Sequence, residues 1–141
     1  MTITKERCIT TATITTRYAE SDQMGFIHHA NHIIWFEVAR MQLFREYGID
    51  LNALEAEGII FPVLSVEAHY HAPTYYDNEV QVRACIASTT HVKLFIQYEV
   101  VHNTGTILCS GTSAHAFVEK KTLKPVPIAK WIKEKIAAVM P

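Results

Sequence analysis

Residues 18–47 read YAESDQMGFIHHANHIIWFEVARMQLFREY, and this stretch decides the fold. It opens with a polar, acidic turn, bends at a glycine, and continues into a segment that we expect to be helical from about His29 or Ala30 to the end of the stretch. Apolar side chains cover nearly every side of this segment between Ile33 and Met41. A helix that is apolar all round is buried all round. The pattern therefore predicts a central helix that the rest of the chain must wrap.

Glycines mark the end of the long helix and of a shorter one that follows. Gly48 is placed to be the left-handed residue after the long helix, and Arg45 in the last turn suits the helix dipole. The run IDLNALEAEG then predicts a short helix that ends at Gly58 and has Asp50 or Asn52 as its N-cap.

The remaining segments have the alternating or β-branched patterns of strands. Residues 9–18, ITTATITTRY, alternate threonine with apolar residues, which predicts a first strand. Four more strand-like runs follow Ile60: FPVLSVEAHYHAPTYY, NEVQVRACIAST, HVKLFIQYEVVHN and TILCSGTSAHAFVEK. Short turns separate them, including a hairpin signal at 103–105, and their regular spacing predicts an antiparallel meander. The final run, IAKWIKEKIAAVM, predicts an amphipathic C-terminal helix.

One strand, a long buried helix and four antiparallel strands define an α+β fold. A single antiparallel sheet of about five strands must curl around the helix to bury it. The length suits one domain, which we expect to span residues 1–141, with a core at about 12–125 and a C-terminal helix at about 127–139. The edges of the sheet would be exposed in a monomer, which favours a dimer that extends the sheet.

Composition narrows the class of protein. The apolar fraction of 49% argues against disorder, and a net charge of −1 without any basic run argues against nucleic acid as the main partner. No apolar run reaches the roughly 18 residues of a membrane span, and the first residues lack the apolar core of a signal peptide. We therefore expect a cytoplasmic protein. Three cysteines without a CxxC spacing, Cys8, Cys85 and Cys109, fit reduced structural thiols.

The polar turn before the long helix holds the strongest candidate for chemistry. Asp22 precedes Gly25, where the chain can turn sharply, so its carboxylate is expected near the helix start. The first N–H groups of that helix, at about His29 to Asn31, have no partners within the helix and can bind an oxyanion or polarise a carbonyl. A carboxylate beside such donors can act as nucleophile or general base in acyl transfer. The structural alternative is an aspartate that only caps a turn.

Histidines near the same turn raise a second possibility. His28 and His32 are four residues apart and share a helix face, which is a possible metal geometry. No carboxylate or cysteine stands at a matching offset, so we expect no metal, and a His29 that faces substrate is the better interpretation. His69 and His71 alternate on one strand face and could line a pocket, but hydrogen-bonded strand histidines are the better interpretation. The sequence has no glycine-rich phosphate loop and no nucleophile elbow.

The segment RYAESDQMGFIHHANHIIWFEVAR resembles the signature of the hotdog-fold acyl-CoA thioesterases of the 4-hydroxybenzoyl-CoA thioesterase and YbgC-like type. That family has a Tyr-x-x-x-Asp segment, a glycine, a His-Ala-Asn sequence, and an aromatic-Glu pair within the helix. The matching residues here are Tyr18, Asp22, Gly25, His28, His29, Ala30, Asn31, Phe36 and Glu37. The stretch FPVLSVEAHYHAPTYYDNEVQV also looks like the family's second and third strands, so the resemblance covers about residues 12–125.

The resemblance implies a hotdog fold, in which a curved antiparallel sheet wraps the long helix. It implies a homodimer whose sheets join edge to edge, with active sites at the interface, and a pairing of dimers into a homotetramer. An acyl-CoA would be the substrate, and no cofactor or metal is expected. Gln23 and His28 stand where members with known aromatic substrates often have proline and an aromatic residue, so the resemblance leaves the acyl group open.

The resemblance also implies roles for individual residues. Asp22 would be the nucleophile or the general base, and the backbone N–H of His29 would polarise the thioester carbonyl. Tyr18 and the His29 side chain would be auxiliary polar groups. Three more residues are expected to bind substrate: Gly25, His28 and Asn31.

These roles make hydrolysis of an acyl-CoA thioester, to a free acid and CoA, the leading hypothesis. A hotdog dehydratase or hydratase is one alternative, and a non-catalytic acyl-CoA-binding protein is another. Neither alternative releases a free thiol, so thiol release separates both from a thioesterase.

Overall fold

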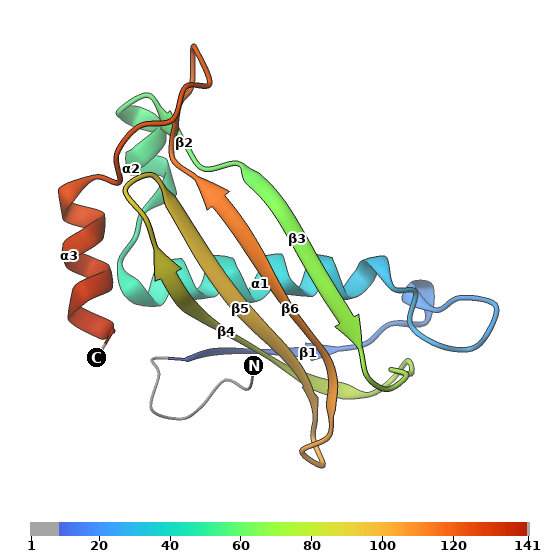
Figure 1. Cartoon of the computed structure of the whole chain (residues 1–141). Coiled ribbons are helices and arrows are strands. Elements are labelled where there is room, and N and C mark those ends of the chain that lie inside the picture. The colour runs from blue at the N-terminus through green and yellow to red at the C-terminus, as the bar shows by residue number, and fades with distance from the viewer. Residues whose placement is uncertain (1–8, 141) are drawn as a thin grey trace.

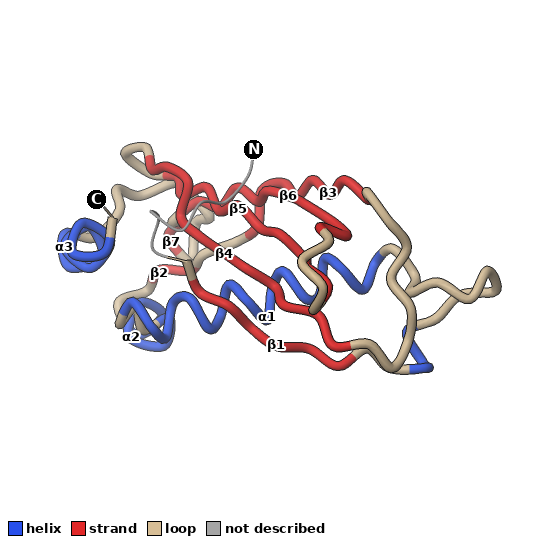
Figure 2. The backbone as a smooth tube through the Cα atoms, turned by 90° about the horizontal axis from the view of Figure 1, so that it is seen from below, coloured by secondary structure: helices blue, strands red, loops and turns tan. Residues whose placement is uncertain are grey.

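A computed structural model describes residues 9–140 and shows one long helix against one sheet (Figure 1). Helix α1 (Ala30–Tyr47) lies along one face of a five-stranded antiparallel sheet, as the view from below shows (Figure 2). The strands are β1 (Thr10–Thr15), β3 (Val63–Tyr70), β4 (Glu79–Thr89), β5 (Lys93–His102) and β6 (Ile107–Ala116). This arrangement confirms the α+β fold with a central helix and about five strands.

Shorter elements complete the chain. A 3₁₀ turn, η1 (Tyr18–Glu20), precedes α1, and α2 (Leu51–Ala56) follows it. Strands β2 (Ile59–Ile60) and β7 (Val118–Glu119) form a small two-stranded ribbon, which the sequence pattern did not predict. Helix α3 (Lys130–Val139) buries Ile132 and Ile136. Within residues 9–140, no helix combines the length and the apolar character that a membrane span requires.

The predicted helix ends are confirmed. Gly48 follows α1 with φ of 74°, and its N–H donates to the carbonyl oxygen of Arg45 at 3.2 Å. That left-handed conformation favours a residue without Cβ. Asp50 caps α2 by accepting the N–H groups of Asn52 at 2.9 Å and Ala53 at 3.3 Å. The turn at Gly48 therefore separates α1 from α2.

The strand order corrects one prediction. The sheet has the order β1-β4-β5-β6-β3, so only β4, β5 and β6 form a meander. Strand β3 pairs with β6, where Ala68 lies opposite Gly111, and it forms one edge of the sheet. Both sides of β4 are already occupied by β1 and β5. The spacing of strand-like segments identifies strands but does not reveal which of them become neighbours.

Only one side of α1 is buried, which corrects the expectation of a helix covered on every side. Ile33, Ile34 and Val38 are exposed, and Ile34 keeps 54% of its surface in contact with solvent. One sheet covers one side of a helix, so the apolar residues on the other side stay open in a single chain. The buried residues of α1 are His32, Trp35, Phe36, Ala39, Leu43, Phe44 and Tyr47.

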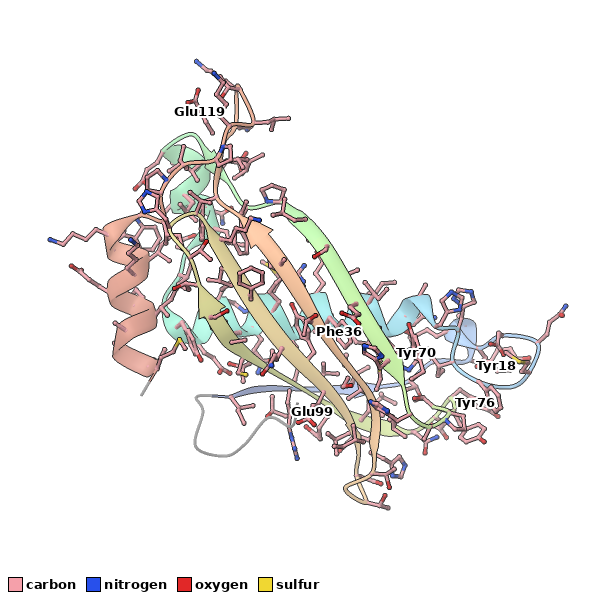
Figure 3. The ribbon with its side chains drawn as sticks, in the orientation of Figure 1. Tyr18, Phe36, Tyr70, Tyr76, Glu99 and Glu119 are labelled. Atoms are coloured by element: carbon pink, nitrogen blue, oxygen red, sulfur yellow. The ribbon has the colours of Figure 1, made fainter. Side chains whose placement is uncertain are left out.

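The middle of α1 touches the sheet at a residue without a side chain. Phe36, labelled in Figure 3, is fully buried. Its ring stacks on the ring of Tyr98, with ring centroids 4.4 Å apart. A Cβ atom on Gly111 would lie 2.6 Å from Cε2 of Phe36 and closer still to the carbonyl oxygen of Glu67. Side-chain atoms do not approach one another that closely. The absence of a side chain at Gly111 therefore lets the Phe36 ring lie directly on β6.

A chain of hydrogen-bonded polar side chains, half-buried at Arg40 and buried beyond it, links α1 to the central strands. Arg40 donates from Nη1 to the hydroxyl of Tyr98 at 3.2 Å, and that hydroxyl lies 2.6 Å from Oγ of Ser113. The same Oγ lies 2.7 Å from Nε2 of His115. His115 is fully buried and stacks on Phe61, and its Nδ1 has no hydrogen-bond partner within residues 9–140. Burial, and then the charge of Arg40, lowers the pKa of His115 to about 4.

We expect Gly111→Ala to destabilise the fold by at least about 2 kcal/mol, because the added methyl group must displace the Phe36 ring and the backbone at Glu67. Urea unfolding followed by circular dichroism measures the change in free energy. Thr112→Ala, an exposed position next in the same strand, is the control and should change the free energy by less than about 0.5 kcal/mol. Equal stabilities of the two variants would refute the close-contact argument.

We expect the free energy of unfolding to fall as the pH drops from about 6.5 to about 4. The folded state keeps His115 neutral down to a pKa of about 4, whereas the unfolded chain binds a proton below about 6.5. The contribution is therefore complete above pH 6.5, and about 3 kcal/mol of it is lost by pH 4. Urea unfolding at several pH values measures the slope. His115→Gln should have a shallower slope over this range, and an unchanged slope would contradict the assignment to His115.

Candidate active site

The residues between η1 and α1 form a closed loop that presents Asp22. Ser21 and Ile27 form an antiparallel bridge across the loop, and the Asp22 N–H donates to the Phe26 carbonyl at 2.7 Å. Gly25 has φ of 82°, and its N–H donates to the Asp22 carbonyl at 3.2 Å. That backbone conformation favours glycine, as the sequence predicted. The loop therefore has a defined shape set by its own backbone hydrogen bonds.

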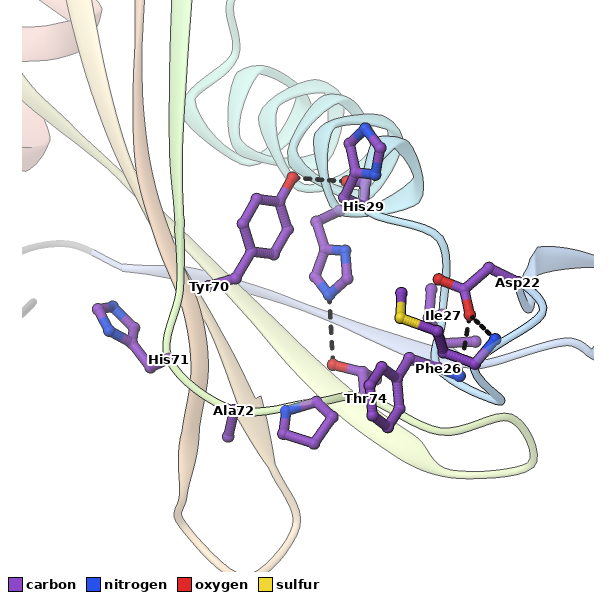
Figure 4. Close-up of a pocket in the computed structure, with 11 residues that line it drawn as sticks. Asp22, Phe26, Ile27, His29, Tyr70, His71, Ala72 and Thr74 are labelled. Atoms are coloured by element: carbon purple, nitrogen blue, oxygen red, sulfur yellow. Dashed lines mark hydrogen bonds between the residues drawn. The ribbon is translucent and has the colours of Figure 1, made fainter.

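The carboxylate of Asp22 is fixed through one of its two oxygens. Oδ1 accepts the N–H groups of Met24 at 2.8 Å and Phe26 at 3.3 Å, shown as dashed lines in Figure 4. Asp22 thus caps its turn, as the structural alternative proposed. No donor within residues 9–140 bonds to the second oxygen, Oδ2. One side of the carboxylate is therefore anchored and the other is unpaired.

Several hydrogen bonds hold the start of α1 and leave one N–H unpaired. The His28 N–H donates to the Glu20 carbonyl at 2.7 Å. The Asn31 N–H donates to the His28 carbonyl at 3.0 Å, and the Ala30 N–H donates to Nδ1 of the His28 ring at 3.2 Å. The N–H of His29 has no acceptor within residues 9–140. Since an 18-residue helix follows, this donor lies at the positive end of the helix dipole.

The end of β3 contacts the start of α1 through a tyrosine. The hydroxyl of Tyr70 donates to the carbonyl oxygen of His29 at 2.6 Å (Figure 4). The Tyr70 ring also meets the rings of His29 and His32 edge-on. Partial burial raises the pKa of Tyr70, so its hydroxyl stays a proton donor. This contact fixes the helix start against the edge strand of the sheet.

A pocket of about 350 Å³ brings these elements together (Figure 4). It lies between the loop, the first turn of α1 and the segment that follows β3. Most of its surface is apolar, while Asp22 and His29 stand on its wall. The lining residues are Asp22, Met24, Phe26, Ile27, His29, His32, Tyr70, His71, Ala72, Pro73 and Thr74.

One buried histidine also belongs to this pocket. Nε2 of His32 lies 3.2 Å from the hydroxyl oxygen of Thr74, and both residues are buried. Burial lowers the pKa of His32, which favours the neutral ring. His32 therefore joins α1 to the segment after β3 as a neutral hydrogen-bonding group. Within residues 9–140, no three histidine, cysteine, aspartate or glutamate side chains are arranged to hold a metal ion.

The structure brings two of the predicted site residues, Asp22 and His29, to the same pocket. Tyr18 is 77% exposed and packs edge-on against Tyr76, with ring centroids 5.4 Å apart (Figure 3). The ring of His28 stacks on that of His29 at 4.2 Å. Tyr18, Gly25, His28 and Asn31 are not among the residues that line the pocket.

The aromatic residues Phe26 and Tyr70, which suit an apolar acyl pocket, do line it. Sequence reasoning did not identify Thr74 or Glu20 as residues near the site. Thr74 follows β3, whose position beside α1 depends on a strand order that local patterns do not encode. One signal for Glu20 was available in the sequence. Trp35 lies in an apolar helical segment, and a buried indole N–H usually has a polar partner. That signal does not say which residue is the partner.

The long helix against a five-stranded antiparallel sheet is the hotdog fold of thioesterases. A family model described as the thioesterase-like superfamily matches residues 16–136. The chain therefore belongs to the thioesterase-like superfamily, which confirms the resemblance seen in the sequence.

Individual relatives are similar along most of the chain. Bacillus subtilis (strain 168) YneP, named as an acyl-CoA thioesterase, is 32% identical over 117 residues, which cover 83% of this chain and 85% of YneP. The acyl-CoA thioester hydrolase YbgC of Escherichia coli O6:H1 is 26% identical over 115 residues, covering 82% and 86%. Among solved structures, a DHNA-CoA thioesterase from Staphylococcus aureus superposes with a TM-score of 0.86 at 28% identity, covering 93% of this chain and 90% of that one.

Proposed function

We propose that this chain hydrolyses an acyl-CoA thioester to a free acid and CoA. Membership of the thioesterase-like superfamily and the names of YneP and YbgC support this reaction. One observation supports the assignment of this reaction to particular residues. Asp22, with an unpaired carboxylate oxygen, and His29, with an unpaired backbone N–H, line the same pocket. Acyl transfer needs both kinds of group within reach of one carbonyl.

Asp22 is the residue that we propose attacks the carbonyl carbon or activates the attacking water. Its Oδ1 is held by the N–H groups of Met24 and Phe26, which orients the carboxylate. Its Oδ2 then accepts a proton from water, or forms a bond to the carbonyl carbon as the CoA thiolate leaves. In the second case, water hydrolyses the resulting anhydride. Both routes consume one water and yield an acid and a thiol.

The N–H of His29 is the group that we propose binds the carbonyl oxygen. Oxygen gains negative charge as the carbonyl carbon becomes tetrahedral, and a fixed N–H donor at a helix start stabilises that charge. The neighbouring N–H groups of Ala30 and Asn31 are already bonded to His28, so they do not compete for the oxygen. Loss of one such donor in other acyl-transfer enzymes costs a factor of about 10²–10³ in kcat.

The auxiliary roles of four further residues stay predictions. Tyr18 is proposed to be a polar group near the substrate, and Gly25, His28 and Asn31 are proposed to contact it. None of the four lines the pocket of a single chain. Gly25 shapes the loop of Asp22, whereas His28 and Asn31 shape the helix start.

A second copy of this chain is the partner that we propose. Strand β3 is an edge of the sheet, and its apolar residues Val63, Leu64 and Val66 are exposed. Exposed apolar edge strands favour pairing with another strand. Tyr70 at the end of β3 lines the pocket, so a copy paired along β3 would border the site. A dimer joined at this edge agrees with these surfaces, and the pairing of dimers into a tetramer stays a prediction.

We expect Asp22→Asn to keep the fold and lower kcat by at least about a hundredfold, because the amide keeps an acceptor for Met24 and Phe26 but is neither nucleophile nor base. A thiol reagent measures CoA release from acetyl, hexanoyl, palmitoyl, benzoyl and hydroxybenzoyl CoA. Asp50→Asn, at the remote cap of α2, is the matched control and should keep full activity, since asparagine also caps helices. Near-full activity of Asp22→Asn on every hydrolysed thioester would exclude the proposed role. No thiol release by the unaltered protein from any of the five would exclude the reaction.

We expect light scattering at micromolar concentration to give at least twice the chain mass of 16.0 kDa. Val66→Lys places a charge on the exposed edge β3 and should shift the protein towards the monomer. Thr13→Lys, on the opposite edge strand β1, is the control and should leave the mass unchanged. A stable monomer of the unaltered chain would rule out the dimer, and equal masses of both variants would rule out pairing through β3.

A further inference from the structure

Glu20 is a buried carboxylate outside the pocket, and its side chain joins the loop of Asp22 to α1. Its side chain keeps only 6% of its surface exposed. Oε2 accepts the indole N–H of Trp35 at 3.1 Å, and Oε1 accepts the backbone N–H of Arg17 at 2.8 Å. Nε of Arg17 lies 3.4 Å from Oε1, but that side chain is 75% exposed and adds little. The contact with Trp35 is the one that reaches the helix.

The backbone of Glu20 also contacts the residues at the start of α1. Its carbonyl oxygen accepts the N–H of His28 at 2.7 Å and the side-chain amide of Asn31 at 3.1 Å. Glu20 directly precedes Ser21, whose bridge to Ile27 closes the loop. Glu20 and His28 therefore form the neck of the loop. The residue after this neck is His29, whose N–H is unpaired.

We propose that Glu20 is a positioning residue that sets the placement of Asp22 relative to the His29 N–H. This inference rests on the proposed hydrolysis. The Glu20 carboxylate anchors the neck to Trp35, one turn inside α1, and the Glu20 carbonyl holds the residue next to His29. Asp22 is two residues along the chain from this anchor, so movement of the neck moves the carboxylate. Glu20 does not line the pocket and touches no reacting atom.

A positioning role and a merely structural role predict different kinetics. Reacting groups must be held to within a fraction of an ångström, and a misplacement of about 1 Å can cost a factor of about 10² in rate. Loosening the neck disturbs this alignment but leaves the apolar walls of the pocket in place. The change should therefore appear in kcat with little effect on KM. A merely structural role would instead lower the fraction of folded protein and leave kcat per folded molecule unchanged.

The test compares Glu20→Gln and Trp35→Phe. Glutamine has only one acceptor oxygen for the two N–H donors of Trp35 and Arg17, and phenylalanine removes the indole donor. We expect each to lower kcat per folded molecule at least about tenfold, with KM within about threefold. Because both variants weaken the anchor that Trp35 and Arg17 form with Glu20, the double variant should lose less than the product of the two single losses. Glu20→Asp, which keeps the charge on a shorter side chain, should recover part of the rate. Leu54→Ala, in the buried face of remote α2, is the control for lost stability and should keep kcat.

Amide hydrogen exchange gives a second measurement that does not depend on activity. The His28 amide, bonded to the Glu20 carbonyl, should exchange at least about tenfold faster in Glu20→Gln, relative to the amide of Ile96 in the central strand. Leu54→Ala should leave that ratio unchanged. If the unaltered chain hydrolyses thioesters and Glu20→Gln behaves like Leu54→Ala in kcat, the positioning role is overturned. If the unaltered chain releases no thiol, the proposed function fails, and an unchanged exchange ratio would then overturn the anchoring role of Glu20 as well.

Discussion

The contact between the ring of Phe36 and the bare backbone of Gly111 sets the position of α1 on the sheet. Any side chain at Gly111 would overlap the Phe36 ring and the carbonyl of Glu67. Phe36 lies two turns from the start of α1, so a helix held at this point presents its first turn beside the end of β3. The pocket forms at that meeting place. Close packing in the centre of the molecule therefore helps to decide where the pocket lies at its end.

Polar contacts complete what apolar packing begins. Tyr70 fixes the helix start to the edge strand, His32 fixes it to Thr74, and Glu20 fixes it to the loop of Asp22. These bonds join segments whose apolar contacts alone would allow them to slide, because burial is not directional. The chain of hydrogen bonds from Arg40 to His115 does the same further along α1, and we expect the buried histidine to make the stability depend on pH.

Local sequence patterns predicted much of the fold and less of the site. Gly48 marked the end of α1, Asp50 marked the start of α2, and the strand segments were recognised, since each depends on neighbours in the chain. The place of β3 beside β6 was missed, because strand pairing depends on the whole sheet. The exposure of Ile34 was missed for a related reason, since an apolar pattern cannot distinguish burial within one chain from burial against a second copy. Asp22 was placed near the helix start from its spacing to Gly25, whereas the bond from Trp35 to Glu20 spans fifteen positions and has no local signature.

At the start of α1, one backbone N–H is unpaired while its neighbours are hydrogen-bonded. The N–H groups of His28, Ala30 and Asn31 all have acceptors, two of them supplied by His28 itself. The His29 N–H between them has none within residues 9–140. The first N–H groups of any helix lack partners inside the helix, and most chains satisfy them with side chains or water. Here the neighbouring donors are bonded and only the His29 N–H of this turn is unpaired among the described residues. His29 lines the same pocket as Asp22, whose second carboxylate oxygen is also unpaired. A turn that served only to begin a helix would have no need to leave both groups unpaired at one pocket.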